Sequence, residues 1–288
     1  MLPEPVEELA KAIADDTTSG AHALALRSLE AYEGLGQAAG SSEDADVLHD
    51  RLVLAQPWMV AVRNASLLGR HLARKDRWSV LPNLRKRLEG ARAEVAEAAA
   101  RALEGTSSVV TVSYSSDVYE ALLRVGEKAP DLEVTVCESR PLREGVKLAR
   151  DLSDAGLRAV VVADAAGPGL VAEADAVLTG ADALLRTGAL VNKIGTLGLA
   201  LACREFGVPF WPLLEALKVE LEGDTRPWEP EDRPPEEMAE NVNARNFYFE
   251  RVDPRLVEEV VCDAGRMTPE RLLRRFRTLE DQIRRYLD

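Results

Sequence analysis

The chain has 288 residues, with 36 lysines and arginines against 49 aspartates and glutamates, and a formal net charge of -13 at pH 7. This length favours two domains over one, and the acidic balance argues against a nucleic-acid-binding surface. No run approaches the roughly 18 apolar residues of a membrane span, and acidic residues stand where a signal peptide has its basic and apolar parts, so we expect a cytoplasmic protein without membrane or direct nucleic-acid partners.

The first hundred residues carry apolar side chains at three- and four-residue intervals, as in PEPVEELAKAIADD and SGAHALALRSLEAYEGL. This spacing is typical of amphipathic helices. Ser19, Ser42 and Ser79 stand where such helices would start. We expect an N-terminal helical domain over residues 1–105.

The pattern changes near residue 106, where the short β-branched run SSVVTVSYSS is followed by a helical one. Strand-like runs such as DLEVTVCES and LRAVVVADAAGPG then alternate with helical runs, and ALVNKIGTLGLALACREFG reads as a helix. This alternation predicts an α/β class domain over residues 106–288, a Rossmann-like, doubly wound parallel sheet. The tail TPERLLRRFRTLEDQIRRYLD reads as one helix with Thr268 at its cap.

Motifs for bound cofactors are missing from the sequence. No G-x-G-x-x-G follows the first predicted strand and no G-x-x-x-x-G-K-[ST] occurs, so neither a dinucleotide nor a P-loop site is supported. The widely spaced Cys137, Cys203 and Cys262 lie among apolar neighbours. Buried free thiols are favoured there over a disulfide or a zinc site. We expect no cofactor and no metal.

Polar residues gather where the predicted strands end. In a parallel sheet the carboxyl ends of the strands and the starts of the following helices form the usual ligand site. Each residue alone has an ordinary role, such as a helix cap or a surface charge. Together they suit an anion such as a phosphate, with Asp182 as a carboxylate among them. The anion-binding candidates are Ser115, Ser116, Arg140, Asn192 and Lys193.

Several segments, in this order behind a helical domain, resemble one family. They are VTVSYSSDVYEAL, VTVCESRPLREGVKLARDL, VLTGADALLRTGALVNKIGTLGLALACREFGVPFWPL and NFYFERVDPRLVEEVVCDAG. The resemblance is to the superfamily of translation initiation factor 2B regulatory subunits (alpha, beta, delta), which also contains ribose-1,5-bisphosphate isomerase and methylthioribose-1-phosphate isomerase. It spans roughly residues 18–270, and ESRP and GAD…VNKIGT are its most specific parts.

The resemblance implies a phosphosugar-type pocket between the two domains and a homodimer or higher oligomer formed through the second. It implies a proton-transferring aspartate at Asp182. The cysteine of the isomerase branches falls on Ser113, whose hydroxyl is far less acidic than a thiol. Where many relatives have an Arg-Pro-Thr run, this chain has QPW, so that Gln56 stands at the arginine position and Trp58 at the threonine position. The resemblance also implies that backbone N–H groups of Ser19, Gly20 and Ala21 meet a phosphate.

These observations favour an initiation-factor-2B-like protein that binds a phosphorylated sugar or nucleotide and has no efficient isomerase activity. Two alternatives remain open. One is an aldose-ketose sugar-phosphate isomerase of the ribose-1,5-bisphosphate type, with Asp182 as general acid and base and Ser113 as a hydrogen-bonding aid. The other is an assembly module without a ligand.

Overall fold

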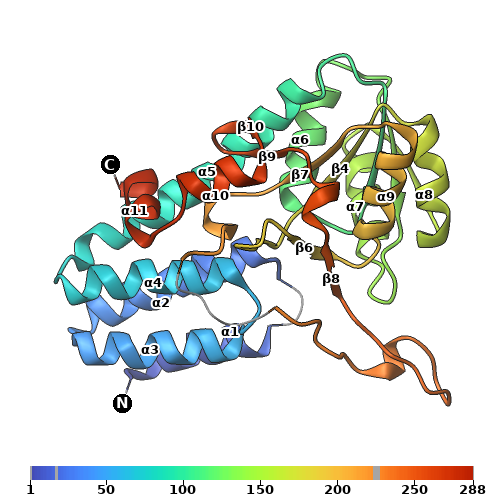
Figure 1. Cartoon of the computed structure of the whole chain (residues 1–288). Helices are drawn as coiled ribbons and strands as arrows, with labels where there is room; N and C mark the ends of the chain where they lie inside the picture. The colour runs from blue at the N-terminus through green and yellow to red at the C-terminus, as the bar shows by residue number, and fades with distance from the viewer. Residues whose placement is uncertain (1, 17–18, 223–227, 288) are drawn as a thin grey trace. The chain divides into compact units, whose positions relative to one another are not determined.

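The computed structural model describes residues 2–16, 19–222 and 228–287. The chain divides into two compact units, each built from more than one stretch of sequence (Figure 1). The helical unit comprises Met1–Arg92, Ala216–Thr225 and Leu273–Asp288, and the α/β unit comprises Ala93–Glu215 and Arg226–Leu272. The predicted fold class, N-terminal helices followed by a mostly parallel sheet, is confirmed.

The first helices of the chain follow the predicted apolar spacing. They are α1 (Glu4–Asp15), α2 (Ala21–Gln37), α3 (Ser42–Ala55), α4 (Val60–Arg74), the 3-10 turn η1 (Trp78–Val80) and α5 (Leu81–Ala102). Helix α3 begins at Ser42, and Ser41 is its N-cap residue. The Ser41 hydroxyl accepts a hydrogen bond from the backbone N–H of Asp44, and the Asp44 carboxylate accepts one from the N–H of Ser41. This reciprocal pair satisfies two of the free N–H groups at a helix start.

Small residues allow the helices of the helical unit to approach closely. Gly69 on α4 faces Tyr32 on α2, and a Cβ at Gly69 would lie 2.4 Å from the tyrosine ring. Tyr32 is fully buried, and its hydroxyl is 3.0 Å from the hydroxyl of Ser66. Burial of large apolar side chains is the main stabilising contribution in such a layer.

The segment around residues 216–222 belongs to the helical unit although it follows the sheet in sequence. The buried Asn64 on α4 donates hydrogen bonds of 2.8 Å to the carbonyl oxygens of Leu217 and Val219. Gln282 on the last helix donates to the carbonyl of Ala216 at 2.6 Å. These amide side chains satisfy carbonyl groups that have no sheet partner, which buried backbone requires.

The α/β unit contains a seven-stranded sheet in the order β10-β9-β7-β4-β1-β2-β3. Its strands are β1 (Ser108–Val112), β2 (Glu133–Cys137), β3 (Arg158–Val162), β4 (Ala176–Gly180), β7 (Phe210–Leu213), β9 (Val260–Cys262) and β10 (Gly265–Met267). All neighbours pair in parallel except β9 with β10. The apolar, β-branched strand sequences suit a sheet covered on both faces.

Helices cover the sheet and alternate with the strands of this unit along the chain. They are α6 (Ser116–Gly126), α7 (Glu144–Asp154), α8 (Gly167–Leu170) and α9 (Thr196–Phe206), with short 3-10 turns η2 (Asp164–Ala166) and η3 (Val171–Glu173) beside α8. The second half of α5 joins α6 and α7 in one apolar core with β1, β2 and β4. The chain proceeds from β1 to β2 and β3 in one direction and to β4 and β7 in the other, so the strand order reverses between β1 and β4. That is where ligands bind in open parallel sheets.

A second, three-stranded sheet lies in the same unit and was not predicted. It consists of β5 (Ala183–Leu184), β6 (Leu190–Lys193) and β8 (Phe249–Val252), paired antiparallel in the order β5-β6-β8. The predicted helix over residues 189–207 is therefore wrong in its first part, because β6 takes residues 190–193 and α9 begins only at Thr196. Gly195, with a φ of 101°, makes the turn between them.

The chain end forms two helices, α10 (Pro269–Arg275) and α11 (Leu279–Leu287), where one was predicted. The backbone N–H and the hydroxyl of Thr278 donate to the Asp281 carboxylate at 2.8 and 2.9 Å, so a new helix start interrupts the run. The remaining short elements are η4 (Ala216–Lys218), η5 (Pro235–Glu237) and η6 (Pro254–Leu256).

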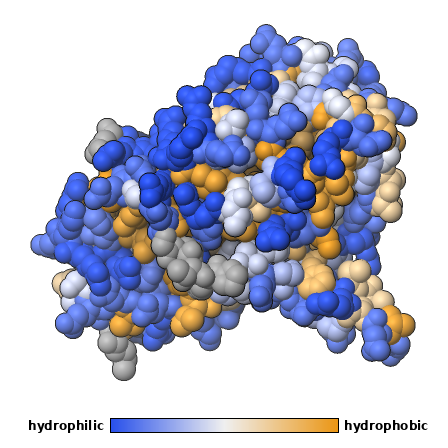
Figure 2. Space-filling model, in the orientation of Figure 1, coloured by the Kyte–Doolittle hydropathy of each residue, from blue (hydrophilic) through white to orange (hydrophobic). Residues whose placement is uncertain are grey.

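Polar and charged residues predominate on the face shown in Figure 2, in keeping with the 49 acidic residues. Among the described residues, no helix combines the length and apolar composition needed to cross a membrane. Cys137, Cys203 and Cys262 are buried free thiols, as predicted.

Candidate functional site

The loop after β1 and the end of β4 meet at the point where the strand order reverses. A Cβ placed on Gly180, the last residue of β4, would lie 2.7 Å from both the Cβ and the Oγ of Ser115, and 3.8 Å from the Oδ1 of Asn192. Glycine at position 180 thus allows Ser115 and Asn192 to lie together at this edge. Both residues were predicted site residues, and the structure brings them together.

The start of α6 is formed by two predicted phosphate-binding serines. Ser115 is the N-cap residue, and its hydroxyl accepts a hydrogen bond of 3.4 Å from the backbone N–H of Val118. Ser116, half-buried, is the first helical residue. The free N–H groups and the dipole of this helix start favour an anion.

Ser113 lies directly after β1 and is 2% exposed. Its φ is 64°, a left-handed conformation that is unfavourable for a residue with a side chain. Ser139, after β2, has a similar φ of 62°. Unfavourable backbone conformations of this kind concentrate at functional sites.

Glu144, the first residue of α7, is a site residue that the sequence did not reveal. Its Oε2 lies 3.4 Å from the Oγ of Ser113, and its Oε1 lies 2.7 Å from the Nζ of Lys193. Lys193 is on β6, and its ammonium also lies 4.6 Å from the centre of the Phe249 ring. The ion pair of Lys193 is thus with Glu144, and a carboxylate accompanies the hydroxyl at position 113.

Asp182 connects β4 with the short strand β5. It is half-buried, and its backbone N–H donates to the carbonyl of Val191 at 2.9 Å. This bond anchors Asp182 beside β6, the strand that carries Asn192 and Lys193. The amide of Asn192 donates to the hydroxyl of Thr196 at 2.9 Å, which fixes its orientation.

Arg140 is presented by the loop after β2. The backbone N–H groups of Ser139 and Arg140 donate to the two oxygens of Asp164 at 2.7 and 2.8 Å, so a protein carboxylate holds this loop. The Arg140 side chain is exposed, and one of its nitrogens donates to the carbonyl of Met238 at 3.3 Å.

The start of α9, predicted to meet a phosphate, holds a carboxylate of the protein. Glu250 on β8 accepts a hydrogen bond of 2.8 Å from the backbone N–H of Leu197. Burial raises the pKa of the Glu250 carboxyl, and hydrogen bonds from the N–H groups of Leu197, Gly195 and Thr196 oppose that rise. Asn192 and Lys193 lie on the strand before this helix rather than in its first turn.

Cys137 ends β2 beside this edge, but it does not replace the missing thiol at position 113. Burial raises the pKa of the Cys137 thiol to about 12, so it remains protonated at neutral pH. A Cβ at Gly167 would lie 2.3 Å from its sulfur, which shows how tightly the thiol is packed. In the described part of the chain, no group of three or more His, Cys, Asp or Glu side chains is arranged to hold a metal ion.

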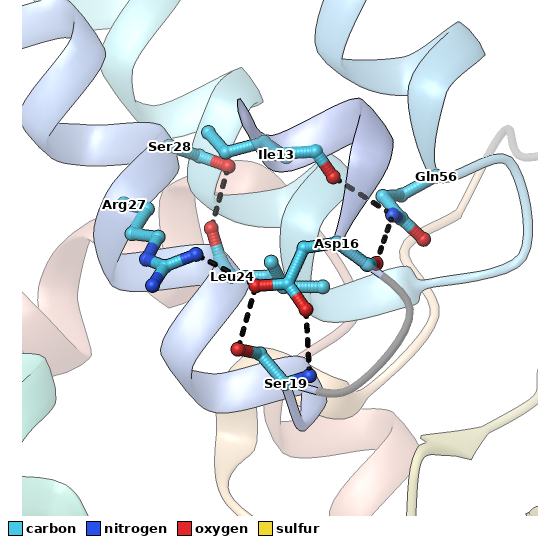
Figure 3. A network of polar contacts seen from close by, with 7 residues as sticks. All are labelled: Ile13, Asp16, Ser19, Leu24, Arg27, Ser28 and Gln56. Carbon is cyan, nitrogen blue, oxygen red and sulfur yellow. Dashed lines mark hydrogen bonds and ion pairs between the residues drawn. The ribbon is translucent and has the colours of Figure 1, made fainter. Parts of the chain in front are cut away.

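The remaining predicted residues, Ser19, Gly20 and Ala21, form the start of α2 in the helical unit. The Asp16 carboxylate accepts hydrogen bonds from the N–H of Ser19 at 2.8 Å and from its hydroxyl at 2.7 Å (Figure 3). The amide of Gln56 donates to the carbonyl oxygens of Ile13 and Asp16 at 2.9 and 3.3 Å. Gln56 thus caps the end of α1.

Comparisons with known proteins identify the family of this chain. A model of the Initiation factor 2 subunit family matches residues 6–269. A Pyrococcus horikoshii protein named translation initiation factor eIF-2B subunit 2-like is 31% identical over 281 residues, covering 94% of this chain and 99% of that protein. Ribose 1,5-bisphosphate isomerase of Haloferax volcanii is 30% identical over 196 residues, which cover 65% of this chain and 61% of that enzyme.

The crystal structure of the Pyrococcus horikoshii translation initiation factor eIF-2B has a TM-score of 0.80 and 28% sequence identity, over 94% of this chain and 99% of that one. The resemblance drawn from the sequence motifs is therefore confirmed. The family match extends over parts of both units of the structure. This chain belongs to the Initiation factor 2 subunit family.

Proposed function

We propose that this protein binds a phosphorylated small molecule, a sugar phosphate or a nucleotide, at the carboxyl edge of the α/β unit, without efficient isomerase activity. The observation that carries the proposal is the close approach of Ser115 to Gly180, which sets the start of α6 at the reversal of strand order. Such a helix start offers N–H donors and a favourable potential to a phosphate.

Carboxylates of the protein already occupy some of the N–H donors at this edge, which limits where a phosphate could bind. Asp164 already accepts the N–H groups of the loop after β2, and Glu250 those at the start of α9. The start of α6 presents Ser115 and Ser116, and the acidic residue of its first turn, Asp117, is buried. We propose that the phosphate contacts these serines and Arg140, which follow the neighbouring strands β1 and β2, and that Asn192 and Lys193 supply further contacts.

The same geometry supports weak isomerase chemistry at most. Ser113 stands where the resemblance places a cysteine, and a hydroxyl does not ionise near neutral pH as a thiol does. The nearby Cys137 thiol has a pKa raised to about 12. Two relatives of this family are named for isomerase or initiation-factor roles, so relatedness does not decide between them.

Calorimetric titration tests the binding proposal. We expect ribose 5-phosphate or AMP to bind, and ribose and adenosine, which lack the phosphate, to give no measurable heat. Arg140→Met should weaken binding about tenfold, because a charge-assisted hydrogen bond is lost from an exposed side chain. Arg158→Met is the matched control, since Arg158 is an exposed arginine at the amino end of β3. Equal affinity in the two variants would place the phosphate elsewhere.

The contact between Ser113 and Glu144 favours a second candidate, the sugar-phosphate isomerase with Asp182 as general acid and base. A carboxylate 3.4 Å from the hydroxyl can accept its proton. Incubation with ribose 1,5-bisphosphate and detection of ribulose 1,5-bisphosphate separates the two candidates. Turnover that Asp182→Asn abolishes would establish the isomerase and overturn the binding-only proposal.

We further propose that the protein self-associates through the α/β unit. Exposed apolar side chains that an interface would cover are Val160 and Val161 on β3 and Leu201 and Phe206 on α9. Light scattering after gel filtration should give at least twice the monomer mass of 31.5 kDa. Phe206→Glu should reduce that mass if α9 contributes, and a monomeric wild type would refute self-association.

A further inference from the structure

The helical unit contains a cluster of hydrogen-bond donors that surround a carboxylate of the protein itself, that of Asp16. The Oδ2 of Asp16 lies 2.7 Å from the hydroxyl of Ser19 and 2.7 Å from a guanidinium nitrogen of Arg27 (Figure 3). Its Oδ1 accepts the backbone N–H of Ser19 at 2.8 Å. The Asp16 side chain is 11% exposed.

These three donors are of the kinds that bind a phosphate oxygen. They are a backbone N–H just before a helix, a hydroxyl and an arginine. Gly20, the N-cap of α2, provides no side-chain oxygen of its own. The carboxylate that meets the donors comes from Asp16, which follows the last residue of α1.

Nearby polar side chains are oriented away from this cluster. The hydroxyl of Ser28 donates to the carbonyl of Leu24 at 2.8 Å, one turn back along α2. The amide of Gln56 is directed to the carbonyl oxygens at the end of α1. The donors that converge are therefore those of Ser19 and Arg27, and both converge on Asp16 (Figure 3).

We propose that Asp16 is a built-in anion that closes the start of α2 to a phosphate. A phosphate oxygen at the same donors would lie against the Asp16 carboxylate, where two negative charges repel each other. The part of this inference that concerns the ligand rests on the proposed function. It assigns phosphate recognition in this chain to the α/β unit. Asp16 then acts as a specificity-determining residue that disfavours a second phosphate at the helical unit.

The test compares phosphate binding by wild type, Asp16→Ala and Asp16→Asn, with inorganic phosphate as the probe. Asp16→Ala removes the carboxylate group, and Asp16→Asn removes only its negative charge. We expect both variants to bind phosphate saturably, with an affinity at least tenfold higher than that of wild type at this position. The binding should appear as a rise in Tm and as a shift of the Ser19 amide resonance. Adding Arg27→Met should remove the gain.

Asp44→Asn is the matched control. Asp44 also accepts the N–H and the hydroxyl of a serine three residues away, at the start of α3. Its removal leaves Asp16 in place, so it should not increase phosphate binding. Circular dichroism verifies that each variant is folded.

Folded Asp16 variants that bind phosphate no better than wild type would overturn the inference. So would a saturable shift of the Ser19 amide when phosphate is added to wild type, a readout that needs no variant. The proposed function fails independently, if the wild type does not bind ribose 5-phosphate or AMP. A phosphate gain in Asp16→Ala that persists with Arg140→Met confirms that the two sites are separate.

Discussion

The ammonium of Lys193 and the carboxylate of Glu144 form an ion pair of 2.7 Å at the carboxyl edge of the α/β unit. Lys193 was predicted to contact a phosphate directly. In the structure its charge is already partly balanced, and the other oxygen of Glu144 lies 3.4 Å from the hydroxyl of Ser113. An anion bound there as proposed would share Lys193 with Glu144, which would limit how tightly the site holds it.

Glu144→Gln should strengthen the binding of ribose 5-phosphate about threefold to tenfold, because it removes a negative charge beside Lys193 without removing a hydrogen-bonding group. Lys193→Met should weaken it by a similar factor. The control is Lys147→Met, which removes a lysine that pairs with Asp151 and lies 4.2 Å from the centre of the Tyr114 ring. Calorimetry measures all three, and weaker binding in Glu144→Gln would contradict this account of the site.

Gly180→Ala should disturb both stability and binding. The new methyl group would lie 2.7 Å from the side chain of Ser115, so the start of α6 has to move. We expect the free energy of unfolding to fall by about 1–3 kcal/mol, as for other overpacked positions, and sugar phosphate binding to weaken. Gly169→Ala, where a Cβ meets nothing within 4 Å, should change neither by much. Urea denaturation and calorimetry check both variants.

A double variant distinguishes the contact from a general effect. Ser115→Gly removes the atoms that the new methyl group meets, so Gly180→Ala should be less destabilising in that background than in wild type. Additive effects of the two substitutions would show that the Gly180–Ser115 contact does not position α6.

Glu250 gives a pH dependence of known sign. Because burial raises the pKa of its carboxyl above the ordinary value of 4.5, the folded protein keeps this proton over a pH range in which the unfolded chain has lost it. The free energy of unfolding then falls as the pH rises through that range. Relative to Glu250→Gln, wild type should lose stability as the pH rises from 4.5 and level off above the raised pKa.

Asp253→Asn provides the comparison of opposite sign. Hydrogen bonds from the Arg255 side chain and backbone lower the pKa of Asp253 below its ordinary value of 3.8. Its contribution to stability is present above pH 3.8 and is lost as the pH falls towards the lowered pKa. Urea denaturation over a pH series measures both variants, and a Glu250 effect with the sign of the Asp253 effect would show that the helix N–H groups outweigh burial.

The alternation of strand and helix runs predicted the large sheet because each of its parallel strands is a local, β-branched run. The second sheet escaped prediction for a physical reason. Strand β6 pairs with β8, more than fifty residues later, so the sequence around β6 carries no local sign of its partner strand. Gly195 is the residue that marks the turn, and the sequence alone does not reveal that this glycine adopts a positive φ.

Among the site residues, Ser115, Asn192 and Asp182 could be placed from strand ends and family motifs. The carboxylates Asp16, Glu144 and Glu250 could not. Their partners lie in other elements or at helix starts whose free donors are known only once the fold is known. An acidic residue in such a chain looks like ordinary surface charge.

The most direct test of the central claim is a crystal structure of the protein grown with ribose 5-phosphate. The account predicts the phosphate at the start of α6, within hydrogen-bonding distance of Ser115 and the Arg140 guanidinium, with Asp16 still bonded to Ser19. A sugar phosphate bound with its phosphate on Ser19 and Arg27, or no ligand at the carboxyl edge of the α/β unit, would contradict it.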